Sequence, residues 1–152
     1  MKNFNKLTAV LILSFISSAL FASDQYTQKK SPYSVSKTID RIESVLKKKG
    51  ITVFARVDHK AGANKAGLKM TDAQLLIFGN PKLGTPLMNE NILMGIELPM
   101  KVLSWKDKND QVWLAYVNPA ELKRRNKMIK NDVFFNKMEK ALEAVTNKAI
   151  SH

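Results

Sequence analysis

The chain contains no cysteine among its 152 residues, and this absence narrows the chemistry open to it. Disulfides, thiol redox reactions and thiolate metal sites are excluded, so packing alone must stabilise the fold. A lipid-modified export signal, which needs a cysteine at its cleavage point, is excluded as well. Histidine is nearly as scarce, because apart from His152 only His59 is present. One histidine cannot supply a zinc site, which takes three or four protein ligands.

Sequence motifs of common enzymes are missing too. No serine lies in a G-x-S-x-G setting, no G-x-x-x-x-G-K-[ST] loop is present, and no pair of carboxylates has a spacing typical of acid–base catalysis. We therefore predict no catalytic residue, no cofactor and no bound metal.

The N-terminal segment 1–22 has the features of a cleaved export signal. Lys2 and Lys6 precede an uncharged run, residues 7–22, that is interrupted by serines and ends in small residues. The run is short for a bilayer span, so we expect cleavage after Ala22 and no stable membrane span afterwards. The mature protein is expected in the periplasm or outside the cell.

The chain is basic, with 25 lysines and arginines against 13 acidic residues and a formal charge of +12. Loss of Lys2 and Lys6 with the signal leaves a net positive charge that favours anionic surfaces through long-range attraction. An exported protein rarely meets nucleic acid, so we predict no nucleic-acid partner. A solvated basic surface without a dedicated partner is the preferred interpretation, and the alternative is an encounter with phospholipid head groups or anionic envelope glycans.

After the signal, a polar segment, 23–33, precedes one domain, 34–150, since about 130 residues suffice for a single core. A weak strand is expected at 26–30. An amphipathic helix then begins after Ser34 and stops at Gly50, because its apolar residues recur at spacings of three and four. These apolar residues are Val35, Ile39, Ile42, Val45 and Leu46.

Four further segments have strand patterns. Residues 51–58 alternate apolar and polar, which predicts a half-buried strand, and the apolar run 75–78 predicts a central strand covered on both sides. A short helix over 59–68 is expected between them. Residues 101–105 and 111–117 flank a polar turn and predict a hairpin.

Helix-start signals mark the rest of the chain. Thr85-Pro86 predicts a helix that lasts to about residue 91 or 94, and Asn118-Pro119 with Glu121 predicts another. A last helix is expected from Asn131-Asp132. Its predicted buried stripe is Phe134, Met138, Ala141, Leu142, Val145 and Ala149. This order of elements suggests an α+β domain with a mainly antiparallel sheet and helices packed on one face.

Three stretches resemble a known family. They are SPYSVSKTIDRIESVLKKKGITVFARVDHKAGANKAGL, LLIFGNPKLGTPLM and LPMKVLSWKDKNDQVWLAYVNPAEL. Together they resemble the bacterial and archaeal "domain of unknown function 302" family, also called TT1751-like. The resemblance implies a small α+β fold that commonly forms homodimers, and it brings no assigned activity. The export signal departs from the simplest members of the family.

The best candidate site lies where two predicted strands end. Asp58-His59 follows the first strand and Gly79-Asn80-Pro81 follows the next. Parallel strands would bring both ends to one rim, whereas antiparallel strands would separate them. Helix N-termini favour anions. The candidate ligand-binding residues are Asp58, His59, Lys60, Asn80, Lys82 and Thr85; the alternative is that the polar groups among them only cap helices and fix turns.

We therefore interpret the protein as an exported binding or structural module, a homodimer, that holds a small anion, a lipid or a glycan. One alternative is a hydrolase-type enzyme that uses His59. Another is an envelope copper-handling protein that uses Met70, Met88, Met94 and Met100, because soft thioethers suit monovalent copper. Methionine as adaptable core filler competes with this alternative. The tryptophans at 105 and 113 are expected in the core or a dimer interface.

Overall fold

The computed structural model describes residues 25–152, so the predicted export signal, 1–22, lies outside the described residues. Within this range five strands form one sheet in the order β1-β5-β4-β3-β2, and every neighbouring pair is antiparallel. The strands are β1 Tyr26–Ser31, β2 Thr52–Asp58, β3 Ala73–Gly79, β4 Met100–Lys106 and β5 Val112–Val117. The predicted hairpin, the weak first strand and the antiparallel α+β sheet are confirmed.

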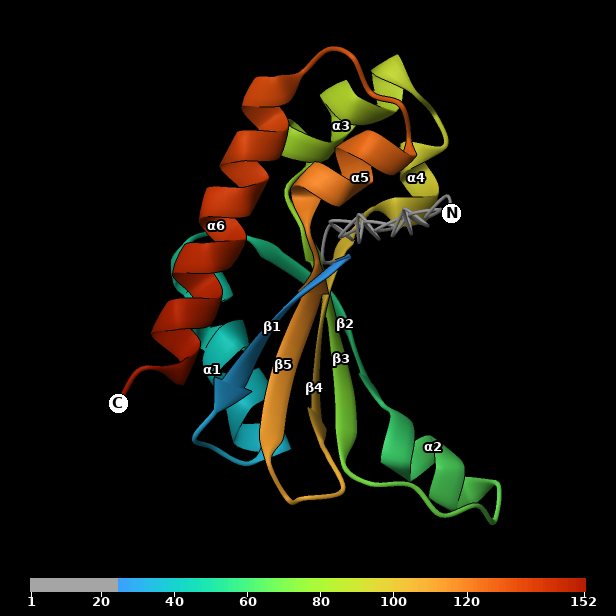
Figure 1. The fold of residues 1–152 in the computed structure, drawn as a ribbon, viewed down its shortest axis with the longest axis vertical. Coiled ribbons are helices and arrows are strands. Elements are labelled where there is room, and N and C mark those ends of the chain that lie inside the picture. The colour runs from blue at the N-terminus through green and yellow to red at the C-terminus, as the bar shows by residue number, and fades with distance from the viewer. Residues whose placement is uncertain (1–24) are drawn as a thin grey trace, which may run out of the picture.

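Two long helices cover one face of the sheet (Figure 1). They are α1 Val35–Lys48 and α6 Asp132–Ile150, and four shorter helices lie at the two ends of the strands. The short helices are α2 His59–Lys65, α3 Pro81–Glu90, α4 Met94–Glu97 and α5 Pro119–Arg125. We call the two ends of the sheet the α2 end and the α3 end, after the helix that each carries.

The core lies between the sheet and the helices α1 and α6. Alternate side chains of each strand point into it, such as Leu76 and Phe78 of β3, and the apolar stripe of α1 meets them. Ile39, Ile42 and Leu46 of that stripe are completely buried. The helix begins where predicted, since the Ser34 hydroxyl accepts a hydrogen bond from the backbone N–H of Lys37. Burial of this stripe holds the long helices on the sheet.

Gly50 terminates α1 before β2 begins, as expected. Its φ of +67° lies in the left-handed region, where a side chain would be strained.

The strand predictions need two corrections. β2 is an edge strand of mostly exposed residues rather than a half-buried one, and a bulge between Val53 and Ala55 breaks its alternation. β3 is buried only on the side of the helices, because its other face carries no helix and leaves Leu75 and Ile77 half-buried. An apolar run alone does not reveal whether one face or both are covered.

The helix predictions need corrections as well. α3 begins at Pro81, with Asn80 as its cap, and Pro86 lies inside the helix. The sequence analysis took Asn80-Pro81 as the turn after a strand, although a capping asparagine followed by proline also suits a helix start. The short helix α4, which contains Gly95, was not predicted.

On α6 the buried stripe is rotated slightly. Phe135 is buried while Phe134 is only partly so, and Thr146 joins the stripe in place of Ala141. Asn131 precedes the helix with a φ of +64° and makes no side-chain cap hydrogen bond.

Candidate functional site

The antiparallel pairing of β2 and β3 separates the two halves of the predicted site. Asp58 pairs with Gln74 at the start of β3, whereas Gly79 at the end of β3 pairs with Thr52. The two pairs are six positions apart along β2, which amounts to about 20 Å. Asp58, His59 and Lys60 therefore lie at the α2 end and Asn80, Lys82 and Thr85 at the α3 end, so the six residues do not form one rim.

At the α2 end the polar groups bind one another. The Asp58 carboxylate accepts hydrogen bonds from the backbone N–H of Ala61 (2.9 Å) and from Gln74 Nε2 (3.0 Å). The bond from Ala61 is the main reason that the pKa of Asp58 lies below its ordinary value. Lys60 Nζ lies 2.6 Å from Asp72 Oδ1. His59 is exposed in the first turn of α2. This arrangement caps and braces a short helix.

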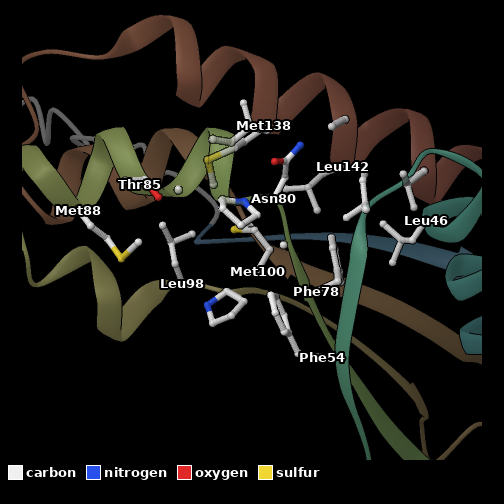
Figure 2. A pocket seen from close by; sticks show the side chains of 18 residues that line it. Leu46, Phe54, Phe78, Asn80, Thr85, Met88, Leu98, Met100, Met138 and Leu142 are labelled. Atoms are coloured by element: carbon white, nitrogen blue, oxygen red, sulfur yellow. The ribbon is translucent and has the colours of Figure 1, made fainter.

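At the α3 end the strands open onto an apolar pocket with a volume of about 220 Å³ (Figure 2). Its walls come from five parts of the fold: the end of α1, β2 with the turn before it, the β3–α3 junction, the α4–β4 segment and α6. The lining residues include Leu46, Phe54, Phe78, Asn80, Thr85, Met88, Leu98, Met100, Met138 and Leu142. The pocket is thus assembled from residues far apart in the sequence.

Two glycines allow the residues around this pocket to pack closely. A Cβ atom on Gly79 would lie 3.3 Å from a ring carbon of Phe54 and 3.4 Å from Pro99 Cβ, so glycine lets these two residues close over the end of β3. A Cβ on Gly84 would lie 3.4 Å from Leu98 Cδ1. Asn80 then fixes the direction of α3, because its Oδ1 accepts a hydrogen bond from the backbone N–H of Lys82 (2.9 Å).

The chemistry of the pocket follows from its lining. None of the residues that line it is ionisable, and only Asn80 and Thr85 have polar side chains. Such a cavity favours an apolar ligand by burial and dispersion and can add one or two hydrogen bonds at its edge. Lys82, the third predicted residue at this end, is exposed and does not line the pocket.

Methionine is prominent in the lining. Met88, Met100 and Met138 all reach the pocket, and Figure 2 shows their sulfur atoms around it. Met94 is completely buried and is not among the lining residues, and Met70 is 44% exposed beyond the α2 end. Of the four methionines that the sequence suggested as copper ligands, only Met88 and Met100 therefore line the pocket. Met138 of α6, which the sequence did not suggest, lines it as well. Within residues 25–152, no cluster of three histidine or acidic side chains is placed to hold a metal.

Sequence reasoning missed most of this site. Asn80 and Thr85 were predicted, but Met138 and Leu142 come from a helix whose apolar residues read as ordinary core, and Phe54 falls among the polar positions of its strand. No local signal marks a core position that borders a hollow, since the hollow depends on how the elements meet.

Across residues 25–152, no helix is both long enough and apolar enough to span a membrane.

Similarity to known proteins covers most of the domain. A protein named "Fluoride-specific ion channel FluC 1" from Brucella suis is 40% identical over 121 residues, which are 79% of this chain and 48% of that protein. "Fluoride-specific ion channel FluC 2" from Brucella melitensis has the same identity over 45% of its length. The chain thus spans under half the length of these curated relatives.

A solved structure shares the fold. The crystal structure of the uncharacterized conserved protein DUF302 from Bacillus stearothermophilus superposes with a TM-score of 0.71 and 23% identity, covering 84% of this chain and 99% of that one. Residues 27–145 also match the family described as "Domain of unknown function DUF302". The chain therefore belongs to the DUF302 family, as its motifs indicated.

Proposed function

We propose that this protein is a small binding module of the cell envelope whose pocket at the α3 end holds an apolar ligand. The observation that carries the proposal is the 220 Å³ hollow with an uncharged lining. An apolar cavity of about 150 Å³ is enough to bind benzene, so this pocket has room for a somewhat larger group. Its volume is below the roughly 300–1,000 Å³ of typical ligand sites, which favours a short or partly inserted molecule.

Among the ligands considered from the sequence, the lining favours the apolar part of a lipid. A small anion or a glycan would lose hydration in the pocket and find only Asn80 and Thr85 as polar side chains. A hydrocarbon group has no comparable hydration to lose. A polar head group attached to it could remain at the mouth of the pocket beside these two residues. The envelope location rests on the predicted signal, and the occurrence of similar segments in proteins named as ion channels is consistent with a role near a membrane.

The test uses the methionines as reporters. With ¹³C-labelled methionine methyl groups, titration with benzene is expected to shift the signals of Met88, Met100 and Met138 and to leave Met70 unchanged. Ala141→Phe fills the pocket and should abolish the shifts, whereas Ala144→Phe on the exposed side of the same helix should preserve them. Equal behaviour of the two variants, or no shift at all in the wild-type protein, would refute the proposal.

Native mass spectrometry then addresses the physiological ligand. Protein purified gently from its own host is expected to retain an extra mass that Ala144→Phe keeps and Ala141→Phe loses.

Copper handling is a second candidate because three thioethers line one pocket. Thioethers bind soft monovalent copper, for which silver(I) is a stable probe. Silver titration should then shift the same three methyl signals, and Met88→Leu with Met138→Leu should weaken binding at least about tenfold, while Met70→Leu should have no effect. Shifts with benzene but none with silver would leave only the apolar-ligand proposal.

The hydrolase alternative gains no support from the geometry of His59. This residue lies at the α2 end, away from the pocket, and Asp58 beside it is engaged as the cap of α2. His59→Ala is expected to leave ligand binding unchanged.

We also infer a homodimer that forms through the sheet face away from α1 and α6. Leu103 lies opposite Leu75 and Ala115 on this face, and the rings of Trp105 and Trp113 stack there with centroids 6.4 Å apart. An apolar sheet face without a covering helix is a common interface between subunits. Leu103→Lys should convert the dimer to a monomer in size-exclusion light scattering, whereas Ser44→Lys on the exposed side of α1 should not.

A further inference from the structure

A cluster of exposed aliphatic side chains lies at the α3 end, outside the pocket. Its members, which we call the apolar tip, are Ile92, Leu93, Ile96, Ile129 and Val133. Ile92 and Ile96 are 77% exposed and Ile129 is 82% exposed. Single exposed aliphatic residues are ordinary, but five of the ten large hydrophobic residues most exposed in the described chain belong to this one region.

Two segments distant in sequence are fastened together to make the tip. Glu90 at the end of α3 accepts hydrogen bonds from the backbone N–H groups of Ile129 and Lys130, both at 3.0 Å. Asn91 Nδ2 donates to the carbonyl of Asn126 (3.3 Å), and Arg125 forms an ion pair with Glu97 (2.7 Å). The loop before α4 and the loop between α5 and α6 are therefore held side by side, with their aliphatic side chains left in water.

Basic residues accompany the tip. The segment 123–130 contains five lysines and arginines and no acidic residue. Lys123 pairs with Asp132, and the two arginines pair with Glu121 and Glu97. Among the described residues, the ammonium groups of Lys127 and Lys130 have no ion pair, and both residues are exposed beside Ile129. Aliphatic side chains flanked by exposed lysines are suited to a surface that is apolar inside and anionic outside.

From these observations we propose that the apolar tip inserts into the interfacial region of a bilayer with anionic phospholipids, with Lys127 and Lys130 against the head groups. The net positive charge that remains after loss of Lys2 and Lys6 adds long-range attraction to such a surface. The attachment is peripheral, since the inserted side chains come from two loops, the short helix α4 and the first turn of α6. This inference concerns a different surface from the pocket and stands even if the pocket takes no ligand.

The tip and the pocket nevertheless share a segment of chain. Met88 and Leu98 line the pocket, and Ile92, Leu93 and Ile96 lie on the chain between them. Insertion of the tip would thus bring one wall of the pocket to the lipid surface, where an apolar ligand could enter without crossing water.

The experiment measures binding to phosphatidylglycerol vesicles by co-sedimentation, with the chain from Ser23 onward, which contains every described strand and helix and omits the apolar signal. Ile92→Ser with Ile129→Ser is expected to weaken binding at least about tenfold, because the variant loses two of the aliphatic side chains that would bury apolar surface in the bilayer. Lys127→Gln with Lys130→Gln should weaken binding about fivefold per lysine, and raised salt should have the same effect on the wild type. Leu68→Ser, which removes an exposed leucine (65%) beyond the α2 end, is the matched control and should bind normally.

Thermal unfolding checks that each variant keeps its fold, which is expected because the substituted side chains are exposed. Absence of vesicle binding by the wild type, or equal binding by the isoleucine variant and Leu68→Ser, would overturn the proposal. Loss of a dimer in the isoleucine variant without vesicles would overturn it too, since the tip would then be an interface between copies of the chain. Pocket occupancy is read separately from the methionine methyl signals, so failure of one proposal is distinguishable from failure of the other.

Discussion

At the α2 end of the sheet, charged and polar side chains bind one another, whereas at the α3 end the strands open onto a hollow of apolar side chains. Asp58, Gln74, Lys60 and Asp72 satisfy their hydrogen bonds locally, and the helix that they support buries none of its residues. The pocket at the α3 end has only two polar side chains in its lining, and most of its walls belong to the core. The Asp58-His59 motif therefore marks local structure at the α2 end. The cavity lies among residues that, for the most part, resemble ordinary core residues in the sequence.

The difference also concerns stability. α2 is attached mainly through its ends and its polar contacts, so it can open locally without exposing the core. Residues at the α3 end connect α1, β3, α3 and α6, so a change there should affect unfolding of the whole domain. Three predictions test this contrast, in order of expected effect.

The largest effect is expected from a truncation in the pocket wall. Leu142→Ala should lower the free energy of unfolding by about 2–5 kcal/mol, because Leu142 is 3% exposed and its removal enlarges the hollow. Val57→Ala at the α2 end should change it by about 0.5 kcal/mol, since Val57 is 39% exposed on an edge strand. Urea denaturation measures both, and equal losses would contradict the contrast.

The next effect concerns the two helix caps. Asn80→Ala removes the cap of α3 and should lower the free energy of unfolding by about 1 kcal/mol, because α3 is anchored in the core through Leu87. Asp58→Ala removes the cap of α2 and should speed hydrogen exchange within α2 while leaving the urea midpoint nearly unchanged. A larger shift of the urea midpoint for Asp58→Ala than for Asn80→Ala would contradict the view that only the α3 end is coupled to unfolding of the whole domain.

The smallest effect is expected from acid. Hydrogen bonds from Lys130, Ile129 and Asn131 hold the pKa of Glu90 below its ordinary value, with the backbone N–H of Lys130 as the largest cause. A lowered carboxyl pKa stabilises the fold above the ordinary value of about 4.5, and this stabilisation disappears as pH falls through the lower folded pKa. The loop between α5 and α6 should therefore loosen only in acid.

Amide NMR shifts measure this prediction. The signals of Ile129 and Lys130 should titrate together at the pKa of Glu90, and that of Ala61 should follow Asp58 at the other end. Glu90→Gln should remove the first titration and leave the second, and persistence of the first in that variant would show that another group causes it.

The sequence alone was sufficient to predict most of the helices and strands and the family to which the chain belongs. Periodicity predicted α1 and the hairpin, and the side chains of Ser34 and Asn118 predicted helix starts that the structure confirms by their cap hydrogen bonds. These features depend on residues within one turn or one strand of each other, so neighbouring residues are sufficient to specify them. The absence of cysteine likewise excluded disulfides, thiol redox reactions and thiolate metal sites.

Only the tertiary structure decided where the candidate site lies. The direction of β2 relative to β3 placed Asp58 and Asn80 at opposite ends, and the meeting of α6 with the β3–α3 junction created the pocket beside Met138. The fastening of Glu90 to the backbone at Ile129 likewise created the apolar tip. Strand direction, cavities and clusters of exposed side chains arise from contacts between residues remote in sequence, so no local pattern of residue types specifies them.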